Sequence, residues 1–225
     1  VLERKPVVFT ALALVAILIG GVIEMVPTFL IKSNVPTIAS VKPYTPLELH
    51  GRDLYIREGC VSCHTQLVRP FRSETERYGE YSKSGEYVYD HPFLWGSKRT
   101  GPDLQRIGGK YNDSWHYYHM IDPGSVSAGS IMPAYPWLLK QKIDLNATAG
   151  KIKALRTIGV PYEAEYEFKA NEDLDKQAQR IVDNLLLEDV KVAKDAEIVA
   201  LIAYLQRLGT DIKQKDKTAE ATLNQ

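Results

Sequence analysis

Two cysteines and a histidine form the densest group of chemically reactive side chains in this sequence. Cys60 and Cys63 are three positions apart, and His64 follows directly. Two thiols at this spacing can each add to one vinyl group of a haem, and the adjacent imidazole can then bind the iron from one face. The pattern therefore predicts covalent attachment of one haem c, with His64 as an axial ligand of the iron.

Two other uses of paired thiols compete with haem attachment. A redox-active dithiol is expected within a βαβ unit, and the surrounding sequence shows no convincing run of alternating strands. A structural zinc site needs two further ligands, which His116 and His119 could supply at the spacing of one helical turn. A haem-free zinc or dithiol interaction module is therefore the competing function of a different class, and these residues alone leave it open.

The second axial ligand is expected to be a methionine. Histidine with methionine is the common pair in electron-carrying haem proteins, and thioether sulfur raises the reduction potential. The chain has three methionines, and Met25 lies in an apolar segment near the N-terminus. Met132 lies in the loop S-I-M-P-A-Y, which Pro133 stiffens. We predict Met132 as the ligand, with Met120, His116 or His119 as the alternatives.

The groups around the haem can also be predicted. The second ring nitrogen of an iron-binding histidine normally donates to an acceptor that fixes the ring, and the carbonyl of Pro102 is the candidate here. The haem propionates need hydrogen-bond donors, and Arg69 and Arg99 are the first candidates among those near in sequence. The wider set of candidates comprises Arg69, Arg72, Trp95, Lys98, Arg99, Arg106, Lys110 and Tyr111.

An apolar segment near the N-terminus predicts a membrane anchor. Residues 7–23 are uncharged and mostly apolar, and the run continues to Ile31 with Glu24 as its one interruption. As a helix this stretch is roughly 37 Å long, enough to cross a hydrocarbon core of about 30 Å. A cleavable signal peptide would have a shorter apolar region, followed by small residues. We therefore predict an uncleaved single-pass anchor over residues 1–32.

Charges at the two ends of this anchor suggest its orientation and a contact. Arg4 and Lys5 precede the apolar run, which places the N-terminus in the cytoplasm and the remaining chain outside the inner membrane. Glu24 lies toward the outer end, where a carboxylate costs less than at the bilayer centre. It is expected either to reach the membrane surface or to contact a polar group on a neighbouring membrane subunit.

The rest of the chain predicts a mainly α domain. Prolines in residues 33–46 indicate an extended linker. Residues 47–211 are predicted to form a helical domain, and residues 212–225 a flexible polar tail. Within the domain, Gly51 and Tyr204 are expected at a close crossing of the first and last helices. Helices are predicted over residues 47–59, 112–121, 147–158, 171–187 and 195–208, with Asn112 or Asp113 as the cap of the second helix and Asn171 as the cap of the fourth. A hairpin or long loop is predicted over residues 78–89.

Composition excludes several classes of function. The 28 basic and 28 acidic residues balance, so the chain lacks the basic surplus of a nucleic-acid-binding protein. Two cysteines are too few for a secreted disulfide framework. No nucleophilic triad, paired carboxylates or phosphate-binding loop stands out, so we expect an electron carrier without bond-making chemistry of its own.

Several longer segments give a specific resemblance. They are R-P-F-R-S-E-T-E-R-Y-G (69–79), Y-D-H-P-F-L-W-G-S-K-R-T-G-P-D-L (89–104), R-I-G-G-K-Y (106–111), M-P-A-Y-P-W-L (132–138), A-L-R-T-I-G-V-P-Y (154–162) and A-Y-L-Q-R-L-G-T-D (203–211). Together they closely resemble the mono-haem cytochrome c subunit, subunit II, of cbb3-type cytochrome c oxidase. The resemblance extends from the anchor to about residue 211.

This resemblance implies a fold, a location and partners. It implies one membrane helix packed against the catalytic haem–copper subunit in a bacterial inner membrane, and a periplasmic class I cytochrome c domain with loop and helix insertions. Electrons would arrive from a di-haem cytochrome c subunit or a soluble cytochrome c, and leave toward the oxygen-reducing catalytic subunit. A free-standing, membrane-anchored cytochrome c that shuttles electrons is the alternative of the same class.

Overall fold

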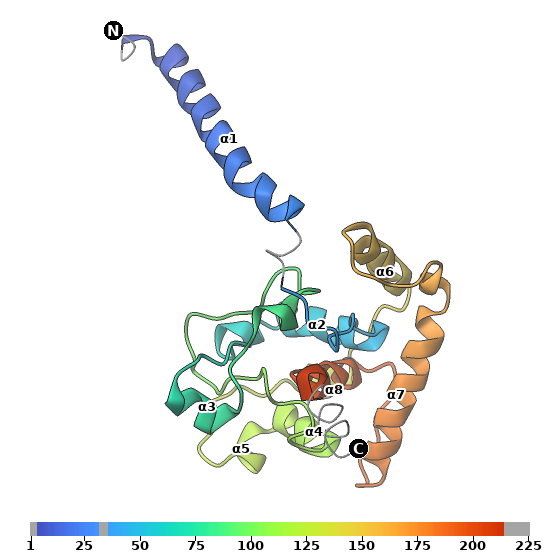
Figure 1. Cartoon of the computed structure of the whole chain (residues 1–225). Coiled ribbons are helices and arrows are strands. Elements are labelled where there is room, and N and C mark those ends of the chain that lie inside the picture. The colour runs from blue at the N-terminus through green and yellow to red at the C-terminus, as the bar shows by residue number, and fades with distance from the viewer. Residues whose placement is uncertain (1–3, 32–35, 214–225) are drawn as a thin grey trace, which may run out of the picture.

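A computed structural model describes residues 4–31 and 36–213 of the chain (Figure 1). The predicted flexible tail lies outside the described residues from position 214 onward. The described part is helical, and an isolated antiparallel bridge between Lys142 and Ala196 is its only β contact. The predicted mainly α fold is therefore confirmed.

The first helix, α1 (Pro6–Leu30), stands apart from the other helices in Figure 1. Its stretch Pro6–Thr28 is the one helix of the described residues that is long and apolar enough to cross a membrane, and its apolar side chains are exposed. Glu24 lies on this helix and is also exposed. An apolar helix with no protein around it fits a single-pass membrane anchor.

The centre of the domain is the crossing of α2 (Pro46–Arg57) and α8 (Glu197–Arg207). A Cβ placed on Gly51 of α2 would be 2.0 Å from the carbonyl oxygen of Ala200 in α8. Tyr55 and Tyr204 fill the space beside this contact, with ring centroids 5.6 Å apart. The expected close crossing is thus present, and only glycine allows it.

The beginning of α2 is fixed by a capping box. The Glu48 N–H donates to Thr45 Oγ1 at 3.4 Å, and the Thr45 N–H donates to Glu48 Oε2 at 2.8 Å. Pro46 occupies the first helical turn, where its missing N–H costs nothing. Pro46 therefore belongs to the helix and not to the end of the linker, where the sequence predicts it.

The other elements surround this crossing. The longer ones are α3 (Arg72–Tyr78), α4 (Asp113–Ile121), α6 (Ala147–Thr157) and α7 (Ala170–Leu186). The shorter ones are α5 (Pro123–Val126) and the 3₁₀ turns η3 (Cys60–Ser62), η4 (Ser84–Tyr87), η5 (Pro136–Leu139) and η6 (Tyr166–Phe168).

The segment of α6 and α7 is packed into the domain. Leu174, Ile181 and Leu185 of α7 are buried in the same core as the apolar side chains of α2 and α8. Ile152 of α6 packs with Leu49 of α2 in a second, smaller core. The two helices therefore cover one side of the central crossing.

The first residues of α4 and α7 differ in how they are capped. Asn112 caps α4 by accepting from the Trp115 N–H at 3.0 Å, as predicted. Asn171 was expected to cap α7, but that prediction was wrong: α7 begins at Ala170, and the Asn171 amide donates to the carbonyl of Leu145 at 3.2 Å. A long-range acceptor was available to this side chain, and the sequence gives no sign of it.

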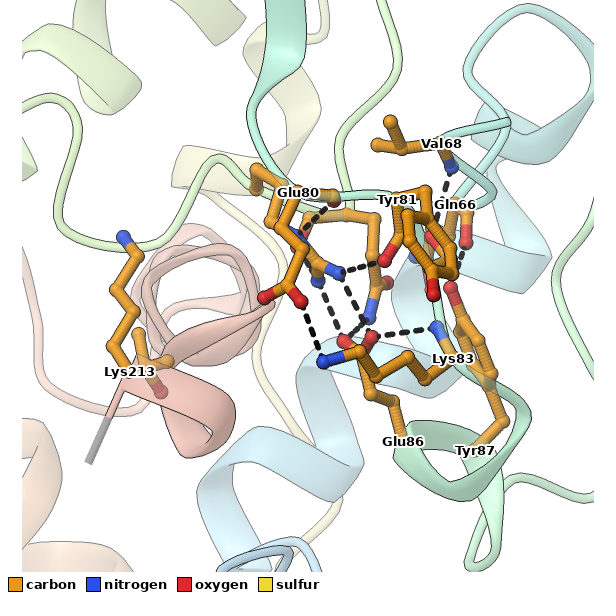
Figure 2. A network of polar contacts seen from close by, with 12 residues as sticks. Gln66, Val68, Glu80, Tyr81, Lys83, Glu86, Tyr87 and Lys213 are labelled. Carbon is orange, nitrogen blue, oxygen red and sulfur yellow. Dashed lines mark hydrogen bonds and ion pairs between the residues drawn. The ribbon is translucent and has the colours of Figure 1, made fainter. Parts of the chain in front are cut away.

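The predicted hairpin or long loop over residues 78–89 is a loop that contains η4. It is held by Glu86, whose carboxylate is nearly buried and pairs with Arg106 at 2.5 Å and with the Lys83 N–H at 2.8 Å (Figure 2). Arg106 was a candidate propionate donor from the sequence. Its guanidinium instead holds this loop against residues 105–109.

A buried histidine makes the packing of α6 sensitive to acid. Lys151 donates to His50 Nδ1 at 3.0 Å, so the Nε2–H donates to Thr148 Oγ1 at 2.8 Å. Burial, and then the charge of Lys151, lower the pKa of His50 to about 4. The unfolded chain, with an ordinary pKa of about 6.5, binds the extra proton first, so stability falls as the pH drops from about 6.5 toward 4.

We expect the thermal unfolding temperature to fall between pH 7 and pH 4.5, and to fall less in His50→Gln, which cannot take up a proton. Circular dichroism of both proteins at both pH values measures this difference. An equal loss in the two proteins would contradict the assignment to His50.

Candidate functional site

The paired cysteines lie on a short turn after α2. Gly59 leaves the helix with a φ of 71°, and η3 then carries Cys60. The His64 N–H closes the turn on the Cys60 carbonyl at 2.8 Å. The Cys60 side chain is half-buried, Cys63 is exposed, and both line one large cavity. The spacing of the cysteines and the geometry of the turn together place both thiols and His64 at one wall of this cavity.

His64 is buried and held by one backbone acceptor. Its Nδ1 lies 2.8 Å from the carbonyl oxygen of Pro102 and donates to it, which leaves Nε2 as the nitrogen with a free lone pair. Burial lowers the pKa of His64, although the Pro102 carbonyl and the charge of Asp103 oppose this. The ring is therefore neutral near pH 7, which is the form that binds metals.

The loop that carries Pro102 approaches the imidazole very closely. The Gly101 N–H donates to the Cys63 carbonyl at 3.0 Å. A Cβ at position 101 would be 2.2 Å from His64 Cε1, so a side chain there would displace the ring or the loop. On the other side, the Tyr55 hydroxyl donates to the His64 carbonyl at 2.5 Å. The histidine is thus positioned from both sides.

The cavity beside His64 is large enough for a planar cofactor. Its volume is about 510 Å³, within the roughly 300–1,000 Å³ of small-molecule and cofactor sites. Both cysteines, His64 and Met132 line it. Apolar side chains supply much of the remaining wall, namely Leu104, Ile107, Met120, Leu201 and Leu205.

Two histidines of α4 add an observation that fits a bound group with polar edges. His116 and His119 line the same cavity. His116 Nε2 and His119 Nδ1 are buried and have no hydrogen-bond partner within the described protein. Buried polar groups are normally satisfied, so a cofactor in the cavity is a natural partner for them. The lining residues therefore fit a haem.

Both candidate methionines reach the cavity. Met132 is half-buried, and its N–H donates to Ser130 Oγ at 3.3 Å. Met120 is 8% exposed on α4, and its carbonyl accepts the Tyr135 N–H at 2.7 Å. Position alone does not separate the two sulfurs, so the choice of Met132 stays a prediction.

Arg99 lies behind the cavity wall. Its guanidinium donates to the carbonyl of Leu67 at 2.7 Å and to Asp103 at 3.2 Å, and it pairs with Glu74. It also lies over the ring of Tyr78, which lines the cavity. The guanidinium of Arg99 is thus occupied by protein groups behind the cavity wall, and Arg99 itself does not line the cavity, so its placement does not support the assignment as a propionate donor.

The other donor candidates divide between the wall and the surface. Tyr111 lines the cavity, whereas Arg69 is exposed and lies outside the lining, and Trp95 stacks on another ring away from it. Arg77 and Lys110 bring positive charge to the wall instead. Lys110 was in the wider set of candidates, but Arg77 was missed, because its only sequence signal was its place in the segment of residues 69–79.

The alternatives to haem attachment find no support in the structure. Within residues 4–31 and 36–213, no three His, Cys, Asp or Glu side chains gather as a group that could hold a metal ion. The same residues contain no strand, so the βαβ setting of a redox dithiol is not present in them.

Comparison with known proteins gives the family. A search of curated protein sequences finds no match. The sequence profile of the family described as "cytochrome C oxidase, mono-heme subunit/FixO" matches residues 1–212. This match covers the anchor, the cavity and all the helices of the domain, and the chain therefore belongs to the FixO family of mono-haem cytochrome c oxidase subunits.

Proposed function

We propose that this chain is the electron-relay subunit of a cbb3-type haem–copper oxidase. It takes single electrons from a di-haem cytochrome c subunit or a soluble cytochrome c and passes them to the oxygen-reducing catalytic subunit. The observation that carries this proposal is one cavity lined by Cys60, Cys63, His64 and Met132, with His64 Nδ1 already occupied by a backbone carbonyl.

The side chains have distinct parts in this proposal. Cys60 and Cys63 would hold one haem by thioether bonds, and His64 and Met132 would bind its iron. When bound, the haem supplies a reversible one-electron couple. Pro102 keeps the His64 lone pair directed at one position, and the apolar wall limits water, which favours a high potential. Arg77, Lys110 and Tyr111 are the propionate partners that the cavity wall offers.

The location follows from the anchor. We place α1 in the bacterial inner membrane, with the N-terminus in the cytoplasm and the haem domain in the periplasm. The basic residues before the helix support this orientation. Glu24, exposed on α1, is proposed to contact a membrane-embedded subunit rather than lipid, because a carboxylate in an apolar helix is costly unless it is paired.

Haem attachment is tested on a denaturing gel. The full chain, matured in a periplasm with a cytochrome-maturation system, is expected to keep a haem stain after denaturation, because thioether bonds survive it. The Cys60→Ser, Cys63→Ser double variant is expected to lose the stain. Unstained wild-type protein with two free thiols would refute the proposal.

The axial ligand is tested by spectroscopy. Met132→His is expected to remove the sulfur-to-iron band in the near infrared and to lower the midpoint potential, because imidazole favours ferric iron more than thioether does. Met120→Leu, in α4, is expected to leave both unchanged. The opposite pattern, with the band lost in Met120→Leu, would move the assignment to Met120.

A further inference from the structure

Two aromatic side chains are exposed side by side on the loop after η4. Phe93 is 51% exposed and Trp95 is 40% exposed, and their rings stack with centroids 4.7 Å apart. Leu94 between them is buried, so the alternation turns both rings outward. Exposed aromatic rings in contact with each other are typical of the centre of a protein interface. We call Phe93 and Trp95 the aromatic pair.

The aromatic pair is fastened to the segment that carries the cysteines. The Leu94 carbonyl accepts the Gln66 N–H at 3.2 Å, and the Gly96 N–H donates to Thr65 Oγ1 at 3.0 Å. A Cβ on Gly96 would be 2.8 Å from the carbonyl oxygen of Val61. The pair is therefore held on the residues on either side of Cys63 and His64.

Tyr87 supports the pair from beneath. Its ring meets Trp95 edge-on at 5.3 Å and Phe93 at 6.1 Å, and its hydroxyl donates to the Gln66 carbonyl at 2.5 Å (Figure 2). The exposed rings thus pack on the buried Tyr87, whose hydroxyl group is hydrogen-bonded two residues after His64. A surface held in this way loses little conformational entropy on binding.

The loop that carries the pair lies beside the linker from the anchor. Ile31 and Pro36 are separated by five Cα–Cα steps, which can span at most about 18 Å. Immediately after this span, Ile38 packs on Gly85, where a Cβ would be 2.8 Å from Ile38 Cγ1. In Figure 1 this part of the domain is the side nearest the end of α1.

Further contacts extend this packing toward the pair. The Tyr44 hydroxyl donates to Asp90 at 3.3 Å, and Arg52 donates to the carbonyl of Pro92, the residue before Phe93, at 2.5 Å. Residues 85–92 therefore pack along the linker and α2. With α1 in the membrane, as proposed above, the short connection would keep this side of the domain close to the membrane surface.

We propose that the aromatic pair docks this domain on a membrane-embedded subunit of the same oxidase. This inference rests on the proposed function. The pair is fixed to the cysteine segment and lies on the side tethered to the membrane, and an electron that leaves this domain needs a protein acceptor, which lipid cannot provide. The partner surface is expected to be an apolar patch at the outer edge of the membrane, able to receive two stacked rings.

Photo-crosslinking in the assembled complex tests the partner. Phe93→p-benzoylphenylalanine is expressed with the whole oxidase, irradiated in membranes, and analysed by haem staining and mass spectrometry. Phe168→p-benzoylphenylalanine is the matched control, since Phe168 is 81% exposed but lies on η6. We expect an adduct with a membrane-embedded protein subunit from position 93 only.

The other outcomes overturn the inference. An adduct with lipid, with a soluble cytochrome or from both positions equally would do so, as would no adduct at all. The haem stain of this chain is read on the same gel, so loss of the proposed function would appear separately as an unstained chain. As a second measurement, Phe93→Ser should reduce copurification of the membrane-embedded subunit several-fold with the haem stain retained, whereas Phe168→Ser should not.

Discussion

Gly51→Ala is expected to destabilise the domain by about 3 kcal/mol, the upper part of the usual range for an overpacked core. The new methyl group would be 2.0 Å from the Ala200 carbonyl oxygen and 2.7 Å from Tyr204 Cβ. Two of the three nearest atoms are backbone atoms of α8, so the helices themselves must separate. Urea denaturation followed by far-ultraviolet circular dichroism measures the loss.

Gly150→Ala provides the control for this prediction. Gly150 is also inside a helix, α6, but a Cβ there meets nothing within 4 Å. This variant is expected to be more stable than the wild type by about 0.5–1 kcal/mol, because alanine loses less backbone entropy on helix formation. Equal effects of the two substitutions would show that the crossing of α2 and α8 is not the cause.

Gly101→Ala is expected to disturb His64, the proposed ligand of the haem iron. Its Cβ would be 2.2 Å from His64 Cε1 and 2.7 Å from Nδ1, so the imidazole or the Pro102 loop must move. Loss of the hydrogen bond that orients a ligating histidine weakens binding roughly 10–100-fold. Carbon monoxide binding by the reduced, purified chain measures this, because it needs an open coordination position.

Pro102→Ala is the matched comparison for Gly101→Ala. It keeps the backbone carbonyl that accepts from His64 and adds no atom near the ring, so carbon monoxide binding should stay close to that of the wild type. If Pro102→Ala increased carbon monoxide binding as much as Gly101→Ala, the position of His64 would depend on the stiffness of the loop more than on the close contact at position 101.

Local signals in the sequence predicted most of the helices. The central helix α2, the capped helix α4 and the final helix α8 lie within two residues of their expected positions, because caps, glycines and apolar spacing act over a few residues. The helix α3 was not predicted. It is short and polar, with Arg72, Glu74 and Arg77 along it, and it has no apolar periodicity to recognise.

The site was predictable in its centre and not at its edges. The turn of Cys60 and His64 follows from adjacent residues, and the contact with Pro102 could be anticipated from the chemistry of a ligating histidine. The place of Arg99 could not, because it depends on Glu74 and Leu67, which lie 25 and 32 positions away. Tertiary contacts decide whether a charged residue lines the cavity or lies on the surface, and such contacts leave no pattern in the neighbouring sequence.

The packing of α7 limits how this subunit could be shortened in evolution or in the laboratory. Residues 140–195 contain α6 and α7, and a deletion of this segment would leave a shorter haem domain. Leu174 and Leu185, however, share their core with Leu201 and Leu205, which also line the cavity. A protein without this segment would expose to water the apolar side chains of α8 that now pack against α7. We expect such a protein to aggregate before the haem is attached.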